Sequence, residues 1–158
     1  MIEAMSVTEK KYSKLLSLLG GYDKIGVAYS GGIDSTLLLH AAQSALGVAN
    51  VIALYAVSNL NSQITIEATR QTFKKNFPKD SKIREVELFP LTWKEVVTNT
   101  EERCYFCKKR MYTALKSTMV TDNCYTLADG TNMDDLKERR PGLRAIRELH
   151  VLTPYIDA

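Results

Sequence analysis

The chain has 158 residues, the length of one compact domain, and 45% of them are hydrophobic and 25% charged. This composition excludes a disordered or low-complexity protein. The net charge of +3 suits an anionic ligand but falls short of the dense basic surface of a dedicated nucleic-acid-binding protein, so we expect no nucleic-acid partner.

The amino-terminal segment MIEAMSVTEKKYSKLL carries charged residues from Glu3 to Lys14, where a signal peptide requires an unbroken apolar stretch. No apolar run elsewhere approaches the length that spans a membrane. We therefore expect a cytoplasmic protein with no membrane partner. Three cysteines, an odd number, do not resemble a disulfide framework, so reduced thiols are expected at Cys104, Cys107 and Cys124.

The first half of the chain alternates between helical and strand patterns. An amphipathic helix is predicted over 6–19, with Ser6 or Thr8 as its cap and Gly20-Gly21 at its end. The elements that follow, in chain order, are a strand over 24–30, a helix over 35–47, a strand over 50–58, and a helix over about 61–77 capped by Asn61 or Ser62.

The second half continues the alternation. A third strand over 81–88 carries several charged residues, which places it nearer an edge of the sheet. The later elements are a short helix opened by the capping box Thr92-Trp-Lys-Glu95, a helix over 104–119, a strand over 124–130, a helical piece opened by Arg140-Pro141, and a strand over 150–155.

Five strands separated by helices of this length predict an α/β fold in which a parallel five-stranded sheet carries helices on both faces. We expect a single domain over 1–158 with three layers. In such sheets, ligands bind at the carboxyl ends of the strands. The hexapeptide 30–35, SGGIDS, lies at the end of the first strand.

This hexapeptide has the properties of a phosphate-binding loop. Its backbone N–H groups and the positive end of the following helix can hold a phosphate, provided that Gly31 and Gly32 leave room for close approach. Hydroxyl donors are available from Ser30, Ser35 and Thr36. Asp34 either binds Mg²⁺ or caps the helix of a plain βα turn. The two common glycine-rich phosphate motifs, G-x-x-x-x-G-K-[ST] and G-x-G-x-x-G, are absent from the sequence.

S-G-G-x-D-S after a first strand resembles the pyrophosphate loop of the PP-loop ATP pyrophosphatases of the N type. Three further segments, at 102–112 (ERCYFCKKRMY), 127–145 (LADGTNMDDLKERRPGLRA) and 147–154, resemble the ATP-dependent sacrificial sulfur transferases of the LarE type. Those enzymes make the nickel-pincer nucleotide cofactor. The resemblance implies a Rossmann-like fold of the adenine nucleotide alpha hydrolase type.

The resemblance also implies a reaction and its site. ATP would adenylate a carboxylate of a pyridinium dicarboxylate mononucleotide, with Mg²⁺ on the phosphates held by Asp34, and a cysteine thiolate would then displace AMP. Ser30, Asp34 and Arg140 would be catalytic, with Arg140 reaching a phosphate. The ATP-binding set that it implies is Ala28, Ser30, Gly31, Gly32, Asp34, Ser35, Thr36, Ala56, Val57, Asp129, Gly130 and Thr131.

The family continues beyond the equivalent of Tyr155, and its sulfur-donating cysteine lies in that later region. We therefore expect adenylation from this chain, and sulfur donation from a homo-oligomer, from a partner chain that supplies a carboxyl-terminal domain, or from a thiol of this chain. A tRNA-thiolating or amidotransferase-linked enzyme and a nucleotide-binding module without turnover are the alternatives.

The cysteines and the polar residues near 140 have two interpretations each. Cys104 and Cys107 are spaced to pack as small buried residues; alternatively, their position at a basic helix N-terminus lowers a thiol pKa and makes a nucleophile. An iron–sulfur cluster is not expected from one C-x-x-C. Alternatives also remain for these residues. Arg140, Arg144 and Arg147 share one helical face, which is a solvated face unless Arg140 reaches a phosphate. Asp134 and Asp135 bind metal or cap the short helix after Asn132, and Asn132 is a turn residue or a pocket residue.

Overall fold

The computed structural model describes residues 6–137 and 141–158 and contains one parallel sheet. Its strand order is β3-β2-β1-β4. The strands are β1 (Ile25–Ala28), β2 (Val51–Ser58), β3 (Lys82–Leu88) and β4 (Leu127–Ala128). In the register, Ile25 lies opposite Val51, and Ile52 lies opposite Lys82. The parallel α/β fold is confirmed, and β3 is the edge strand that its charges predicted.

The expected fifth strand is reduced to one bridge. Leu152 pairs in parallel with Ala128, its N–H donates to Leu127 O at 2.8 Å, and its carbonyl accepts from Asp129 N at 2.8 Å. His150, just before this segment, has a φ of 49°, and Pro154 begins a helix just after it. Extended backbone therefore cannot continue on either side, and the described part of the sheet has four strands instead of five.

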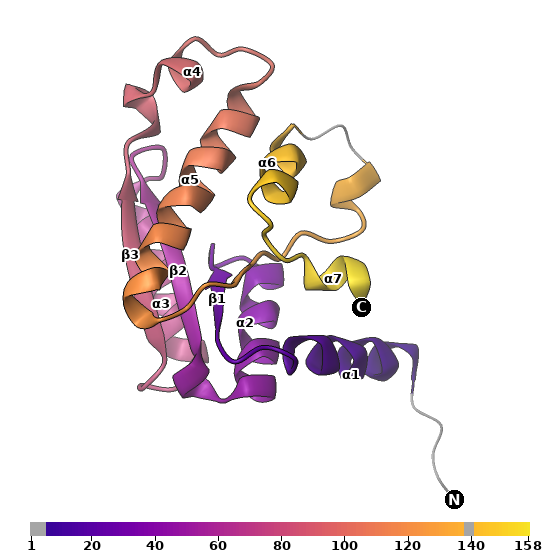
Figure 1. Cartoon of the computed structure of the whole chain (residues 1–158). Helices are drawn as coiled ribbons and strands as arrows, with labels where there is room; N and C mark the ends of the chain where they lie inside the picture. Colours follow the sequence, from indigo (N-terminus) through magenta and orange to yellow (C-terminus); the bar gives the residue numbers. More distant parts are fainter. Residues whose placement is uncertain (1–5, 138–140) are drawn as a thin grey trace, which may run out of the picture.

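Helices cover both faces of the sheet (Figure 1). They are α1 (Val7–Leu19), α2 (Ile33–Leu46), α3 (Gln63–Asn76), α4 (Lys94–Val97), α5 (Arg103–Met119), α6 (Gly142–Glu148) and α7 (Pro154–Asp157). Val27 and Ala53 face α1, α2 and α3, whereas Leu54 faces α5 and α6. Alternate residues of each strand thus build two separate core layers. No helix in the described ranges is long and apolar enough to cross a membrane.

The helix ends confirm two predicted caps and correct a third. Ser6 and Glu9 form a capping box, with Ser6 N–H donating to Glu9 Oε2 at 2.6 Å. Ser62 accepts from Thr65 N at 3.1 Å and caps α3. The box predicted at Thr92 is wrong, because Thr92 ends a short 3-10 turn and donates its hydroxyl proton to Phe89 O at 2.8 Å.

Candidate nucleotide-binding site

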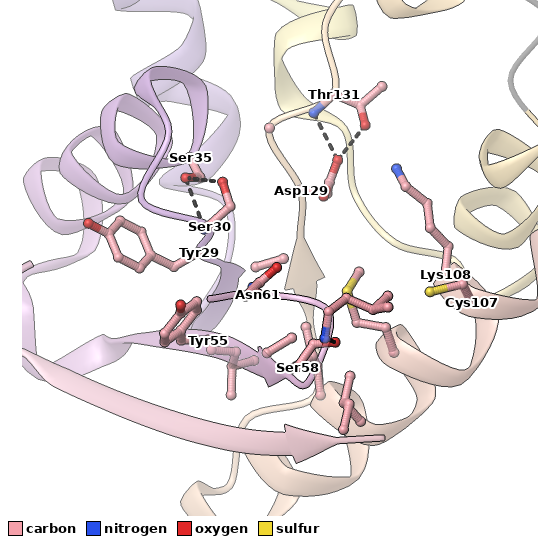
Figure 2. A pocket seen from close by; sticks show the side chains of 18 of the residues that line it. Tyr29, Ser30, Ser35, Tyr55, Ser58, Asn61, Cys107, Lys108, Asp129 and Thr131 are labelled. Atoms are coloured by element: carbon pink, nitrogen blue, oxygen red, sulfur yellow. Dashed lines mark hydrogen bonds between the residues drawn. The ribbon is translucent and has the colours of Figure 1, made fainter. Parts of the chain in front are cut away.

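A cavity of about 440 Å³ opens at the carboxyl ends of the strands, between α2 and α5 (Figure 2). This volume lies within the range of small-molecule sites. Predicted residues that line it are Ala28, Ser30, Asp34, Ser35, Ala56, Asp129, Gly130 and Thr131. Gly31, Gly32, Thr36 and Val57 are predicted residues that do not line it. Arg140 lies outside the described residues.

Ser35 holds the loop between β1 and α2 in shape. Its Oγ accepts from Ser30 N at 3.1 Å, donates to Gly32 O at 3.2 Å, and lies 3.1 Å from Ser30 Oγ. Ser30 Oγ also accepts from Gly32 N at 3.3 Å. Ser35 is buried, whereas Ser30 is exposed and faces the cavity. The loop is thus closed by side-chain hydroxyls before any ligand binds.

Gly31 takes a backbone conformation that other residues rarely adopt. Its φ is +80°, and a Cβ built on it would lie 2.9 Å from Thr69 Cγ2. Both the dihedral angle and the close packing against α3 therefore require glycine here. The sequence prediction that a side chain at Gly31 would obstruct the turn agrees with this geometry.

The amino-terminal end of α2 has no side-chain cap. Gly32 is the N-cap residue and supplies no side-chain hydrogen bond. Asp34 is the second residue of the helix. The alternative interpretation of Asp34 as a plain N-cap is therefore wrong. A helix leaves its first N–H groups without intrahelical partners and carries a partial positive charge at that end. These groups are suited to an anion.

Two other segments brace this end of α2. A Cβ added to Gly130 would lie 3.2 Å from Ser35 N, so the turn after β4 packs directly against the first turn of α2. Tyr155 of α7 donates its hydroxyl proton to Asp34 O at 2.8 Å. Burial, together with the nearby Asp34 charge, raises the pKa of Tyr155, which keeps this donor protonated. Asn132 Nδ2 reaches Asp34 Oδ2 at 3.5 Å.

Asp129 organises the turn after β4. Its Oδ1 accepts from the N–H of Thr131 at 2.9 Å and also from the Thr131 hydroxyl. Its Oδ2 accepts from the hydroxyl of Tyr112 at 2.8 Å. Burial raises the pKa of Tyr112, and the Asp129 charge adds to that effect. Both Asp129 oxygens are thus engaged within the protein, so this carboxylate positions Thr131 and α5.

Asn132 and the two aspartates after it form a turn. Asn132 Oδ1 accepts from Asp134 N at 2.9 Å and from Asp135 N at 3.2 Å, and Asp135 Oδ2 accepts from Asn132 N at 3.0 Å. Asp134 pairs with Lys137 at 2.6 Å and is 82% exposed. Capping explains these side chains, as one of the two interpretations expected.

The cysteines follow neither interpretation fully. Cys104 is exposed, Cys107 is half-buried and lines the cavity, and Cys124 is buried. The expectation that Cys104 and Cys107 are both buried is therefore wrong for Cys104. Burial raises the pKa of Cys107, although the charges of Arg103 and Lys108 oppose this, so the expected lowering is also wrong. Among residues 6–137 and 141–158, no three His, Cys, Asp or Glu side chains gather as a metal site.

Arg144, which was expected to share a helical face with Arg140 and Arg147, contacts residues at the start of α5. The Arg144 guanidinium lies 3.5 Å from the centroid of the Tyr105 ring and pairs with Glu102 and, at 3.6 Å, with Glu148. The contacts with Tyr105 and Glu102 tie α6 to the start of α5, whereas the pair with Glu148 lies within α6, and none of these contacts involves the cavity. Arg147 is exposed, as a solvated face predicts.

Sequence reasoning missed the wall that α5 contributes. Lys108 and Met111 line the cavity, as do Ser58 at the end of β2 and Asn61 after it. The spacing of Lys108, Met111 and Leu115 by three and four residues was a signal for one helix face. With Cys107 expected beside the sheet, this spacing could have predicted that the same helix face lines the cavity.

Curated relatives match most of the chain. No family model matches the chain. An uncharacterised protein of Synechocystis sp. is 33% identical over 150 residues, covering 94% of this chain and 54% of that protein. Pyridinium-3,5-bisthiocarboxylic acid mononucleotide synthase of Lactiplantibacillus plantarum is 31% identical over 144 residues, covering 91% of this chain and 51% of the synthase. The chain spans about half the length of the curated relatives that it matches.

A solved structure shares the fold. The glutamine-dependent NAD⁺ synthetase of Acinetobacter baumannii, in complex with adenosine diphosphate, superposes with a TM-score of 0.68 at 18% identity. The match covers 87% of this chain and 28% of the synthetase. At this identity the likeness shows the architecture, which is the one that the strand order gives independently.

Proposed function

Because the chain belongs to the PP-loop superfamily and is related in sequence to a LarE-type synthase, we propose that it binds ATP in this cavity and adenylates a carboxylate. The observation that carries the proposal is the uncapped end of α2, which faces the cavity beside Ser30. AMP would pass to the carboxylate oxygen, and pyrophosphate would leave.

The loop would hold the pyrophosphate portion of ATP. Free N–H groups at the start of α2 and the hydroxyl of Ser30 would donate to phosphate oxygens, and Ser35 would keep them in place. Such preorganised donors cost no rearrangement when negative charge builds up on the leaving pyrophosphate. Ala28, at the end of β1, and Ala56, near the end of β2, line the cavity with small side chains and would leave space for the adenine.

Asp34 fits the Mg²⁺ that ATP brings. It is an exposed carboxylate that lines the cavity, and Mg²⁺ in such sites binds one or two carboxylates together with substrate phosphates. When bound, the ion supplies charge neutralisation on the phosphates. Asn132 Nδ2 would help to orient the Asp34 carboxylate, while the hydrogen bond of Tyr155 holds the Asp34 backbone carbonyl.

The carboxylate substrate would be a pyridinium dicarboxylate mononucleotide. The L. plantarum relative is named for the corresponding bisthiocarboxylic acid, which supports this choice. Sulfur transfer would follow adenylation and would draw its sulfur from a partner subunit, a carboxyl-terminal region or Cys107. Cys107 is the thiol that lines the cavity.

Pyrophosphate release from MgATP tests the proposal. The wild-type protein should release pyrophosphate and AMP when the dicarboxylate nucleotide is added, and Asp34→Asn should lower the rate about a hundredfold or more, because the metal contributes several kcal/mol. Asp134→Asn, at an exposed carboxylate outside the cavity, should keep the wild-type rate. ATP binding without pyrophosphate would contradict an enzyme and indicate a nucleotide-binding module.

A further inference from the structure

The proposed function gives no role to the basic side chain on one wall of the cavity. That wall is formed by α5, opposite the loop of Ser30 and Ser35 (Figure 2). Lys108 is the only basic side chain among the described residues that line the cavity, and it shares the cavity with three carboxylates, those of Asp34, Asp129 and Asp135. Figure 2 shows the Lys108 side chain extending from α5 toward the segment of Asp129 and Thr131.

Neighbouring groups fix the direction of Lys108. Its alkyl chain lies flat against Gly142, because a Cβ added to Gly142 would lie 2.6 Å from Lys108 Cδ. Its ammonium lies 5.8 Å from the centroid of the Tyr112 ring. Tyr112 is itself held by its hydrogen bond to Asp129. A small residue on α6 and a fixed aromatic ring thus set the path of a flexible side chain.

The ammonium of Lys108 is available for a ligand. No carboxylate within the described ranges pairs with it, whereas the next residue, Lys109, pairs with Glu148 at 2.9 Å. A half-buried cation in a concave site that lacks a counterion among the described residues attracts an anion from solution. The three cavity carboxylates would otherwise repel an anionic acceptor.

We propose that Lys108, positioned by Gly142, binds an anionic group of the acceptor that is to be adenylated. This inference rests on the proposed function and assigns the acceptor to the α5 wall, with the ATP phosphates at the end of α2. The recognised group is a carboxylate or a phosphate, the two anions that a pyridinium carboxylate nucleotide carries. Lys108 is thus a specificity residue for the acceptor and has no role in holding ATP.

Calorimetric titrations of the whole chain separate these roles. The probes are nicotinic acid mononucleotide and nicotinamide mononucleotide, which differ in one carboxylate and share the phosphate. Both are titrated with a non-hydrolysable ATP analogue and Mg²⁺ present. The variants are Lys108→Met and its matched control Lys109→Met, whose lysine lies on the same helix and does not line this cavity.

Lys108→Met should weaken probe binding about tenfold to a hundredfold, the effect of losing one charged hydrogen bond, and should leave the affinity for the ATP analogue within twofold. A loss confined to nicotinic acid mononucleotide identifies the carboxylate, and an equal loss for both probes identifies the phosphate. Lys109→Met should bind like the wild type. Gly142→Ala should reproduce part of the loss, because the added methyl group displaces Lys108.

Three results would overturn the inference. The first is an unchanged probe affinity in Lys108→Met. The second is a fall in the affinity of Lys108→Met for the ATP analogue instead of the probes. The third is that neither probe binds to a wild-type protein that binds the ATP analogue. Absence of ATP-analogue binding in the wild type would instead remove the proposed function. Circular dichroism melting of each variant confirms that a loss of binding is not a loss of fold.

Discussion

Replacing Gly31 by alanine should disable the loop while the domain stays folded. The φ of +80° costs an alanine about 1–2 kcal/mol. The added Cβ would lie 2.9 Å from Thr69 Cγ2 and 3.0 Å from Thr69 Oγ1, and such overpacking costs about 1–3 kcal/mol. The free energy of unfolding should therefore fall by about 2–5 kcal/mol. If the loop relieves this contact by shifting, Ser30 leaves its position in the cavity.

Thermal melting and calorimetric titration with the ATP analogue measure both consequences. At about 2–4 °C per kcal/mol for a chain of this size, Tm should fall by roughly 4–20 °C, and the affinity for the analogue should fall at least about tenfold. Gly47→Ala is a control for a positive φ without packing, because Gly47 has a φ of +81° and a ψ of 153° and a Cβ there would have nothing within 4 Å. This variant should lose free energy of unfolding through its backbone conformation alone, and its affinity for the ATP analogue should be that of the wild type.

A second substitution separates the two contributions. Thr69→Ala removes both atoms nearest to the added methyl group and leaves Thr69 Cβ at 3.3 Å. Gly31→Ala in that background should regain about 1–3 kcal/mol and part of the affinity. If Gly31→Ala loses the same free energy of unfolding in the Thr69→Ala background as in the wild type, then the packing of the loop on α3 is not what requires glycine.

Two further predictions concern groups at the edge of the site. Tyr155→Phe should lower the free energy of unfolding by about 0.5–1.5 kcal/mol and weaken nucleotide binding, because the backbone carbonyl of Asp34 loses its donor. An unchanged Tm and an unchanged affinity for the ATP analogue would show that this hydrogen bond does not stabilise the start of α2. In a variant with serine at the other two cysteines, alkylation of Cys107 by iodoacetamide should rise with pH only above the ordinary thiol range, because burial raises its pKa. Half-maximal alkylation below that range would contradict this.

The features that follow from local sequence were predictable. SGGIDS after an apolar strand predicted the turn at Gly31, and the charges of 81–88 predicted an edge strand. The fifth strand was not predictable from its apolar pattern, because that pattern does not reveal the left-handed backbone of His150. Extended propensity in a segment of six residues gives way to one such turn and one proline.

The α5 wall depended on tertiary contacts that no local pattern contains. Which face of α5 meets the cavity is set by how it packs on Leu54 and Leu127, and the direction of Lys108 is set by Gly142, which lies 34 positions away in the sequence. The Cys107 pKa shows the same limit. Basic neighbours in the sequence suggested a lowered pKa, but burial, which depends on the whole fold, has the larger effect and raises it.

The uncapped end of α2 shows how the fold accommodates its site. A serine or aspartate cap would satisfy one orphan N–H group and contribute roughly a few tenths of a kcal/mol over glycine. It would also put a side chain between those groups and a phosphate. The helix compensates in its interior, where Leu38, Leu39, Ala41 and Ala42 are fully buried. Complete burial of one leucine is worth about 1.5–3 kcal/mol, several times the missing cap, so α2 can leave its donors free and still be held in place.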